Sequence, residues 1–337
     1  MNRLAIIVLN WNGADDAIKC MESLLASTGI TPYIILVDNA SADDSVAVLE
    51  QFVTQHSDDI HFIKNPVNSG YTGGNNVGFT YALSQGFTYI GTLNPDATAD
   101  KDWARLLVEE LDRSPETGIV GGQLRRADNT TLDSTGDFYT TWGIPGPRGR
   151  DRSIDEAPKE NEFVFGITGG AFIARAEVFQ TVGLLDEKFF MYFEDVDLCF
   201  RTQLAGYKVR YVADAIAYHK VSASTDKVPG LAITQTFKNL PMLFTKNVPL
   251  KLWPTIYPRF VLAYFLILGH AIVKGRGGPA SKGFIQSWGL VPHMFRERKR
   301  IQSSRKVSDD YIDSIILHDI PIEQTGLRKF RKVFTGK

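Results

Sequence analysis

The segment Tyr33-Ile-Ile-Leu-Val-Asp-Asn-Ala-Ser41 decides the fold class of this chain. Tyr33–Val37 is a short apolar run, which is typical of a strand that is buried on both faces of a sheet. The run ends at Asp38, and a helical pattern follows over Asp43–Gln55. Because buried strands that alternate with helices form βαβ units, the segment predicts an α/β fold with a mainly parallel central sheet.

The same alternation extends on both sides of this segment. Apolar runs predict further strands at Leu4–Leu9, Ile60–Lys64, Tyr89–Leu93 and Ile119–Leu124, and periodic segments predict helices at Asp15–Ser27, Gly73–Ser84 and Asp100–Ser114. Residues 125–161 are rich in Gly, Pro, Arg and Asp, so we expect a long loop or lid there. Phe163–Ala174 again has strand character, and after His219 several prolines separate short apolar helices.

Cysteine usage and charge limit the environment and the partners of the chain. Its two cysteines, Cys20 and Cys199, cannot form a disulfide framework, so we expect a reducing compartment. Residues 1–10 are interpreted as a first strand, not as a signal peptide. Residues 1–219 carry 17 Lys and Arg against 31 Asp and Glu, whereas residues 220–337 carry 20 against 7. This asymmetry predicts an anionic partner for the basic part, either a nucleic acid or a membrane surface.

Polar residues follow several of the predicted strands. Asn10, Asp38, Asn68 and Asp96 come just after strand ends, and the carboxyl ends of parallel strands meet at one edge of a sheet. We therefore expect these residues to line one ligand-binding crevice. Asp38 suits a hydrogen bond to the base or ribose of a nucleotide, although it also suits an Asx-type cap of the next helix.

Two further motifs suit a phosphate and a cation. The glycines of Asn68-Ser-Gly-Tyr-Thr-Gly-Gly-Asn-Asn-Val-Gly78 allow an anion to approach a helix N-terminus, or they form a flexible turn. The spacing matches neither a P-loop nor a dinucleotide fingerprint. In Asn94-Pro-Asp-Ala-Thr98, the carboxylate of Asp96 could hold Mg²⁺ or Mn²⁺ beside a diphosphate, or cap a turn.

The strongest chemical signal is an acidic cluster. Glu194, Asp195 and Asp197 follow an aromatic run in Phe189-Phe-Met-Tyr-Phe-Glu-Asp-Val-Asp-Leu198. Like charges at this density are costly unless a cation, hydrogen bonds or a proton compensates, so one carboxylate is a candidate general base. The alternative is that these acids only complement the dipole of a helix. His219 is a candidate metal ligand downstream.

Eight motifs in this order resemble glycosyltransferase family 2, which has the GT-A fold. They are Val8-Leu-Asn-Trp-Asn12, Val37-Asp-Asn-Ala-Ser41, Asn68-Ser-Gly-Tyr with Gly74-Asn-Asn-Val-Gly78, Leu93-Asn-Pro-Asp96, Gly169-Gly-Ala-Phe172, Gly183-Leu-Leu-Asp-Glu-Lys-Phe-Phe190, Glu194-Asp-Val-Asp197 and Tyr218-His219. The resemblance covers about residues 1–225 and is greatest to the bacterial rhamnosyltransferase-like branch. It implies a GT-A catalytic domain over residues 1–225 and a helical extension over residues 226–337.

The resemblance also implies roles for individual residues. Asp195 resembles the catalytic base of an inverting transfer, with Glu194 and Asp197 orienting the acceptor. Asp96 and His219 resemble metal ligands for Mg²⁺ or Mn²⁺, although Asn94 replaces the first aspartate of the family's Asp-x-Asp motif. The residues expected to bind the donor or acceptor are Asn10, Asp38, Asn68, Gly70, Asn76, Asn94 and Gly170. Because the Gln-x-x-Arg-Trp signature of processive synthases is absent, a single transfer is favoured.

The implied donor is a nucleotide-sugar, with dTDP-L-rhamnose preferred, and the implied acceptor is a polyprenyl-diphosphate-linked glycan of a cell-surface polysaccharide. A nucleotidyltransferase or a non-catalytic nucleotide-sugar-binding scaffold are the alternatives. The apolar segment Phe260–Val273 has fourteen residues, short of the roughly 20 that span a bilayer. With basic residues between Arg296 and Lys306 it predicts a peripheral position on an anionic membrane surface, at the cytoplasmic face. A helical hairpin packed on the catalytic domain or in a homodimer is the alternative, and no recognised nucleic-acid module occurs.

Overall fold

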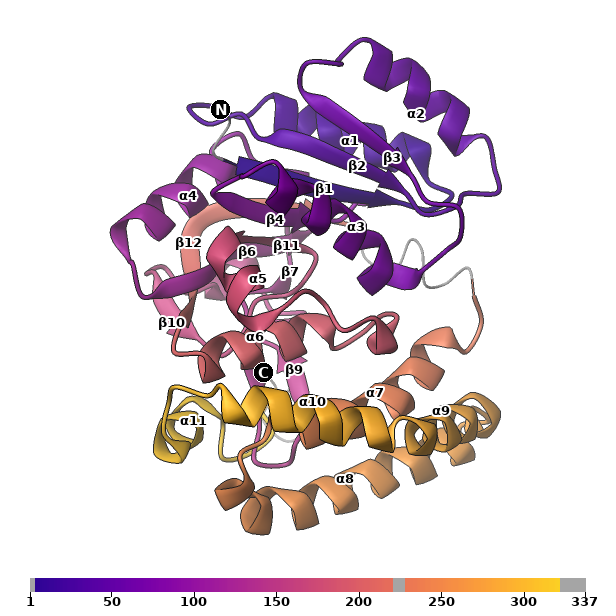
Figure 1. Ribbon diagram of the computed structural model, residues 1–337, viewed down its shortest axis with the longest axis vertical. Helices are drawn as coiled ribbons and strands as arrows, with labels where there is room; N and C mark the ends of the chain where they lie inside the picture. The colour runs from indigo at the N-terminus through magenta and orange to yellow at the C-terminus, as the bar shows by residue number, and fades with distance from the viewer. Residues whose placement is uncertain (1–3, 221–227, 322–337) are drawn as a thin grey trace.

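The computed structural model describes residues 4–220 and 228–321, in which a central sheet is flanked by helices and a helical layer lies at one end (Figure 1). The strands are β1 Leu4–Asn10, β2 Tyr33–Asp38, β3 Ile60–Lys64, β4 Tyr89–Leu93, β5 Ala97–Ala99, β6 Thr117–Arg126, β7 Leu132–Ser134, β8 Asp137–Tyr139, β9 Pro145–Pro147, β10 Glu162–Val164, β11 Ala171–Arg175 and β12 Lys208–His219. The helices are α1 Ala14–Leu25, α2 Ser45–Thr54, α3 Gly70–Ser84, α4 Trp103–Arg113, α5 Ala176–Val182, α6 Glu194–Leu204, α7 Leu231–Asn247, α8 Trp253–Val273, α9 Gly277–Gly289, α10 Val291–Ser303 and α11 Asp309–Ile315.

One half of the sheet is parallel, as predicted. β1 pairs in parallel with β2 and β4, and β2 pairs in parallel with β3. All residues of β1 and β4 are buried, because helices cover both faces of the sheet. The register places Asn10 beside Asp38, so that the carboxyl ends of β1 and β2 lie at the same edge.

The other half of the sheet is mixed. The full order is β10-β12-β6-β11-β4-β1-β2-β3, with β5 on β12 and β7 on β6. β11 is antiparallel to both β4 and β6, whereas β12 is parallel to β6 and antiparallel to β5 and β10. The sheet is therefore parallel over β4-β1-β2-β3 and changes direction at β11.

Two segments differ from the sequence expectation. Residues 125–161 are not a plain loop, because they contain β7, β8, β9 and a 3-10 turn at Ile154–Glu156. Phe163–Ala174 is not one strand, since a turn with Gly166, Gly169 and Gly170 separates β10 from β11. That turn carries backbone groups of the candidate site.

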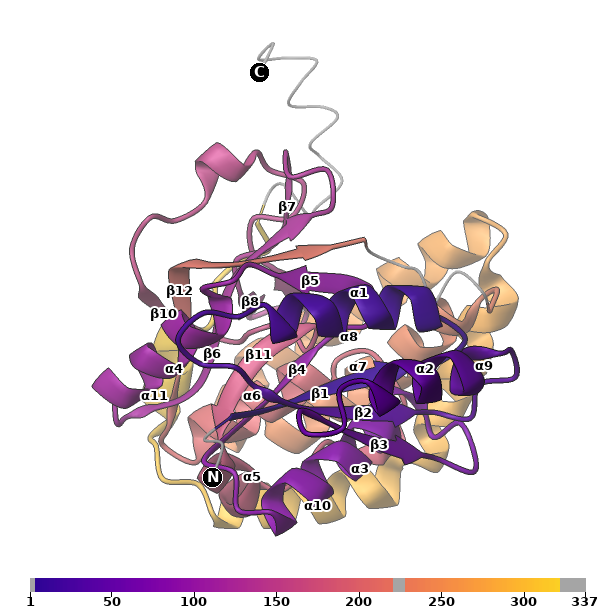
Figure 2. The ribbon, with the colours of Figure 1, turned by 90° about the horizontal axis from the view of Figure 1, so that it is seen from above.

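The core consists of three clusters. Side chains of α1, α2 and α4 pack on one face of the sheet, and those of α3, α5 and α6 pack on the other (Figure 2). The third cluster joins α6 to α7, α8, α9, α10 and α11. The helical layer is therefore fixed to the sheet half through α6.

The apolar helix of the extension is longer than predicted. α8 has 21 residues and includes two prolines. Pro254 lies in the first turn, where its missing N–H breaks no helical hydrogen bond, and Pro258 lies inside the helix without ending it. The predicted boundary between residues 225 and 226 lies outside the described residues.

Candidate active site

Asn10 and Asp38 form one corner of the site, at the carboxyl ends of β1 and β2. The Asn10 side-chain amide donates to the Asp38 carboxylate at 2.9 Å. The other Asp38 oxygen accepts from the backbone N–H of Ser41 at 2.9 Å, and the Ser41 hydroxyl donates at 2.6 Å to the oxygen shared with Asn10. Asp38 is 1% exposed, so this carboxylate also fixes the turn that follows β2. It does not cap α2, the next helix, whose N-cap residue is Asp44.

The glycine-rich segment begins α3 at Gly70. Its φ is +72°, and a Cβ atom there would lie 2.5 Å from the Phe190 ring, so both the backbone conformation and the close contact require glycine. Asn39, which the sequence analysis did not single out, donates to the Asn68 side chain and to the Gly70 carbonyl, both at 3.0 Å. Gly70 is therefore a packing point between α3 and the loop that precedes the acidic cluster.

Asp96 and His219 lie together because β5 pairs with the end of β12. Nε2 of His219 is 3.2 Å from the Asp96 carboxylate and 3.5 Å from the Asn94 side-chain nitrogen. Nδ1 of His219 is 2.9 Å from a carboxylate oxygen of Asp133, a residue of β7. Burial disfavours the imidazolium, but hydrogen bonds to Asp133 and Asp96 outweigh burial and raise the pKa of His219 to about 9.

Asp96 and His219 can hold a divalent cation only if a bound diphosphate supplies further oxygen ligands. No group of three or more His, Cys, Asp and Glu side chains that could hold a metal occurs in residues 4–220 and 228–321. Asp96 and His219 offer one carboxylate and one imidazole, and Asp133 can orient the imidazole as outer-shell partners of metal-bound histidines do. Diphosphate oxygens would complete the coordination that hard cations prefer.

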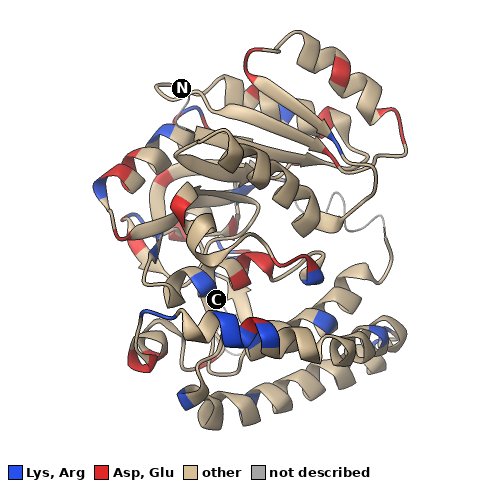
Figure 3. Cartoon of the chain, viewed as in Figure 1, with Lys and Arg blue, Asp and Glu red and all other residues tan. Residues whose placement is uncertain are grey.

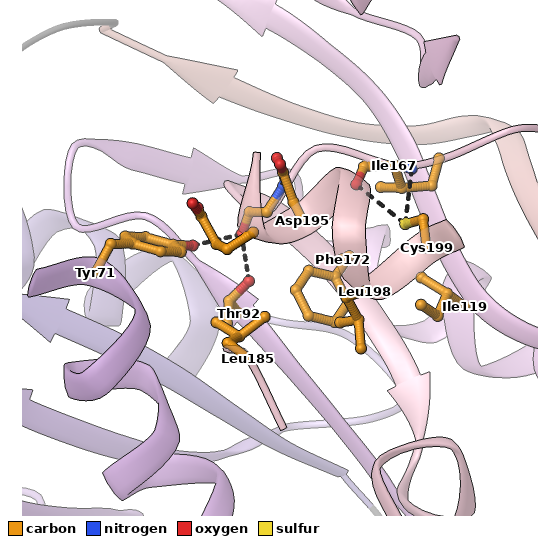
Figure 4. Close-up of a pocket in the computed structure, with 11 residues that line it drawn as sticks. Tyr71, Thr92, Ile119, Ile167, Phe172, Leu185, Asp195, Leu198 and Cys199 are labelled. Atoms are coloured by element: carbon orange, nitrogen blue, oxygen red, sulfur yellow. Dashed lines mark hydrogen bonds between the residues drawn. The ribbon is translucent and has the colours of Figure 1, made fainter. Parts of the chain in front are cut away.

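Asp195 lies at the first turn of α6 and is held by the turn before β11. One carboxylate oxygen accepts from the backbone N–H of Gly169 at 2.8 Å, and the other accepts from its neighbour Val196 at 2.8 Å. The carbonyl of Gly169 accepts from the hydroxyls of Tyr71 and Thr92, at 2.7 and 2.5 Å (Figure 4). The Gly169 peptide is thus bonded on both sides, and it fixes where the carboxylate lies.

The surroundings of the acidic pair favour protonation. Burial and the charge of Asp195 raise the pKa of Glu194 well above its ordinary value. Burial also raises the pKa of Asp195, although backbone hydrogen bonds from Gly169 and Val196 oppose the shift. The pocket beneath the pair is lined mainly by apolar side chains and has room for about one water molecule, so it excludes solvent rather than holding substrate (Figure 4).

Asp197 is not where the sequence analysis expected it. It is 0% exposed and bonds to Arg201 at 2.8 Å, to Lys246 at 2.9 Å and to the Asn247 side chain at 2.7 Å. Burial would raise the pKa of Asp197, but Lys246 and Arg201 outweigh burial and lower it. A carboxylate that is buried and paired in this way cannot orient an acceptor, so Asp197 anchors α6 to the helical layer.

Asn76 is also tied into the protein. Its amide group donates to the Leu185 carbonyl at 2.8 Å, and its oxygen accepts from the Leu185 N–H at 3.0 Å. Both bonds join α3 to the segment before α6. The structure therefore gives Asn76 a role in holding these two elements together rather than a position toward a ligand.

The loop before Glu194 is held in an uncommon conformation. Phe190, Tyr192 and Phe193 have φ values of 64°, 69° and 69°. Residues with a Cβ atom rarely adopt the left-handed region, and each costs of order 1–3 kcal/mol, so such strain persists only where the surroundings fix it. Here the strained loop leads directly into the acidic pair.

Asn239 of α7 supplies that support. Its side-chain nitrogen lies 3.0 Å from the Phe189 carbonyl, 2.8 Å from the Met191 carbonyl and 2.9 Å from the Tyr192 carbonyl. Asn239 is 0% exposed, and the neighbouring Lys238 ammonium donates to the Phe189 carbonyl at 3.2 Å. Sequence reasoning missed Asn239 and Asp133, because no spacing rule relates a helix of the extension or a short strand in a presumed loop to this site.

The geometry therefore brings together three parts. A half-buried carboxylate lies beside a fixed peptide, a carboxylate–imidazole pair lies at the end of β12, and an amide–carboxylate corner lies at the ends of β1 and β2. Gly170 joins the first two parts, since its carbonyl accepts from the Asn94 N–H at 2.8 Å. This arrangement suits proton removal from a hydroxyl next to a site for a charged leaving group.

Comparisons with known proteins show which family this chain resembles. The profile of the family described as Glycosyl transferase family 2 matches residues 5–183, more than half of the chain. The low-salt glycan biosynthesis hexosyltransferase Agl10 of Haloferax volcanii is 27% identical over 212 residues, which cover 60% of this chain and 62% of that relative. The chain thus matches less than two thirds of that protein's length.

Two relatives carry names that mention rhamnose. The N-acetylglucosaminyl-diphospho-decaprenol L-rhamnosyltransferase of Mycobacterium tuberculosis is 25% identical over 250 residues, covering 67% of this chain and 78% of the relative. The dTDP-rhamnosyl transferase RfbF of Shigella flexneri is 24% identical over 205 residues, covering 60% and 64%.

Solved structures confirm the predicted GT-A fold. The mannosyltransferase PcManGT from Pyrobaculum calidifontis, in complex with GDP-Man and Mn²⁺, aligns with a TM-score of 0.54 and 14% identity over 93% of this chain and 85% of that chain. GalNAc-T7 with UDP, GalNAc and Mn²⁺ aligns with a TM-score of 0.59 and 14% identity over 72% and 47%.

Proposed function

Because the chain belongs to glycosyltransferase family 2, we propose that it is an inverting glycosyltransferase that moves one sugar from a nucleotide-sugar to a lipid-linked glycan. The observation that carries the proposal is the Gly169–Gly170 turn. Through its backbone this turn contacts Asp195 on one side and Asn94 on the other. The proposed base and the proposed diphosphate site therefore have a common, rigid support.

Asp195 would remove the proton from the acceptor hydroxyl as that oxygen attacks the anomeric carbon of the donor. Its raised pKa brings the carboxylate closer to the value that suits a general base near neutral pH. Glu194 would bind the acceptor beside it. Its Oε2 atom is buried and has no hydrogen-bond partner among the described residues, so an acceptor hydroxyl would satisfy it.

The donor would lie between the carboxyl ends of β1, β2 and β4. Asp38 and Asn10 would contact the nucleoside, and Asn68, Gly70 and Asn94 would line the diphosphate side. Asp96 and His219 would hold Mg²⁺ or Mn²⁺, which supplies positive charge to the leaving diphosphate when bound. The Mn²⁺ in both structural relatives supports this assignment.

For the donor we propose dTDP-L-rhamnose, and for the acceptor a polyprenyl-diphosphate-linked glycan of a cell-surface polysaccharide. The names of the Mycobacterium tuberculosis and Shigella flexneri relatives support the sugar, and the former supports the lipid carrier. We also propose a catalytic unit over residues 1–225, a helical extension over residues 226–337 and action at the cytoplasmic membrane face.

Calorimetry with a panel of dTDP-, UDP- and GDP-sugars tests the donor. We expect dTDP-L-rhamnose to bind most tightly, with weaker binding when EDTA replaces Mn²⁺. Asp96→Ala should lose the Mn²⁺ dependence and retain the weaker, metal-free binding. Equal donor affinity with and without Mn²⁺ in the wild type would remove the metal from the proposal, and binding of no nucleotide-sugar would overturn the function.

A further inference from the structure

The outer face of α8 and α9 is apolar and exposed. Eight large apolar side chains between residues 262 and 288 are 40% or more exposed, and no other part of the described chain gathers as many: Leu262, Phe265, Leu266, Ile267, Ile272 and Val273 of α8, and Ile285 and Trp288 of α9. We call these eight residues the α8–α9 face. A contiguous apolar surface of this kind marks a contact with a protein or a membrane.

The charge around this face favours a membrane. The sequence has no Asp or Glu from Val228 to Arg296, and α8, α9 and the turn between them carry Arg259, Lys274, Arg276 and Lys282. In Figure 3 basic residues mark this layer, while most acidic residues lie in the sheet half. Apolar side chains bordered by cations and free of anions are complementary to anionic lipid.

The opposite side of α8 is packed against the protein. The Tyr264 hydroxyl donates to the Phe237 carbonyl of α7 at 2.8 Å, and the ring of Phe260 stacks on Phe244 with a centroid distance of 4.9 Å. Leu250–Val273 is long and apolar enough to cross a bilayer by length and composition, with a mean hydropathy of 1.7. Crossing would break these contacts, so a helix with one packed side and one exposed side fits the plane of the interface.

We propose that the α8–α9 face docks this protein, in the plane of the interface, on an anionic lipid surface. The proposal deepens the proposed function and rests on it for its purpose, since a lipid-linked acceptor is held at such a surface. α7 separates the face from the acidic loop: its Asn239 bonds the loop at Phe189, while the Phe237 carbonyl accepts from Tyr264 of α8. Docking would therefore hold the loop at a set height above the lipid.

Three of the basic residues between Arg296 and Lys306 are bonded within the protein. The Arg298 guanidinium donates to the Thr245 and Val248 carbonyls, at 2.9 and 2.7 Å, and lies over the Trp253 ring. Arg300 pairs with Glu297, and Arg305 pairs with Asp309. Arg298 caps the end of α7, so reversing its charge would disturb the fold and would not test membrane binding.

Co-sedimentation of the full chain with phosphatidylcholine vesicles, with and without phosphatidylglycerol, tests the proposal. We expect binding only to the anionic vesicles, and weaker binding at high ionic strength. Lys274→Glu/Lys282→Glu should weaken binding more than about tenfold at low salt. The matched control is Lys19→Glu/Lys101→Glu, which makes the same change in net charge at exposed lysines of the sheet half and should bind like the wild type.

Leu262→Ser/Leu266→Ser should weaken vesicle binding by at least about tenfold, because two apolar side chains no longer enter the interface. Phe163→Ser, at an exposed apolar residue of β10, is its control and should leave binding unchanged. Thermal unfolding and nucleotide-sugar affinity should stay at wild-type values in all four variants. These two readouts separate failure of the docking proposal from failure of the proposed function.

Three results would overturn the docking proposal. The first is absence of binding to anionic vesicles at low salt. The second is a dimer in lipid-free solution that Leu262→Ser/Leu266→Ser dissociates, since a second copy would then cover the face. The third is vesicle association that withstands alkaline carbonate, which would place α8 across the bilayer.

Discussion

The sheet half and the helical layer use apolar and polar residues in opposite ways. In the sheet half, β1 and β4 are wholly buried, and the polar site residues lie at strand ends. In the helical layer, α7 buries polar side chains toward the site, with Asn239, Lys246 and Asn247 at 0–1% exposure, while α8 leaves apolar side chains outside. The layer is thus attached inward by hydrogen bonds and ion pairs as well as by the apolar cluster that joins it to α6, and its outer apolar surface remains available for another contact.

Asp195→Asn should have the largest effect of these variants, on turnover, and should leave the properties of the helical layer unchanged. Removing the base should lower acceptor-dependent turnover by about 10²–10⁴, because that is the usual contribution of general-base catalysis. Donor affinity and vesicle binding should be unchanged. Steady-state kinetics and calorimetry measure these quantities, and an equal loss of donor affinity would assign Asp195 a structural role.

Lys246→Met should destabilise both regions together. Lys246 is 1% exposed and pairs with Asp186 at 2.6 Å and Asp197 at 2.9 Å, so its loss removes the cation that these two carboxylates share and leaves Asp197 with Arg201 alone. We expect the free energy of unfolding to fall by about 3–5 kcal/mol, in one cooperative transition. Two separate thermal transitions in the wild type would show instead that the layer folds independently.

A matched control for that variant is Lys251→Met. Lys251 pairs with Asp310 at 3.0 Å, but both side chains are mostly exposed. Its loss should change the free energy of unfolding by less than about 1 kcal/mol.

Acid titration gives a second measurement on the Lys246 ion pairs. Although burial opposes the shift, Lys246 lowers the pKa of Asp186 and contributes to lowering that of Asp197. The stability from these pairs is therefore present above pH about 4 and is lost as pH falls through the lowered pKa values. Lys246→Met should show a smaller loss, because His293 still lowers the pKa of Asp186 and Arg201 still lowers that of Asp197.

Asn239→Ala tests whether the helical layer positions the acidic loop. The variant removes the donor that lies near three loop carbonyls, a change worth about 1–3 kcal/mol. We expect a lower kcat with an unchanged donor affinity, since the loop leads to the acceptor side. Thr236→Ala is the control, because that hydroxyl bonds only within α7, to Ala232. An equal loss of stability without a change in kcat would contradict the positioning role.

Lys238→Met should have the smallest effect of these variants, a small increase in the stability of the folded protein. Burial lowers the pKa of Lys238 to about 8, so the folded state disfavours the ammonium. Because the unfolded chain keeps its proton up to about pH 10, wild-type stability should rise between pH 8 and 10. Thermal unfolding across this range should show that rise in the wild type, and Lys238→Met should lose it while melting higher at pH 7.

The sequence predicted the sheet half better than the helical layer, for physical reasons. Apolar runs such as Tyr33–Val37 report burial directly, so β2 was found almost to the residue. The turn at Gly169 depends on tertiary contacts with Tyr71 and Thr92, which no local pattern encodes. Asp197 was misassigned because its partner Lys246 is remote in sequence. A cluster of acidic residues at the start of a helix has the same sequence pattern whether its carboxylates face a ligand or form ion pairs within the protein.

The change of strand direction at β11 has a bearing on how such enzymes diversify. Most residues proposed to touch the donor precede β11, whereas Glu194 and Asp195 follow it. On the proposed roles of these residues, exchanging the segment after β11 between homologues would change the acceptor specificity and keep the donor specificity. Asp186 and Asp197 of that segment are bonded to Lys246, so α7 must be inherited with it. The segment after β11 and α7 are therefore coupled by buried ion pairs, and chimeras that transfer the two together should fold where shorter grafts do not.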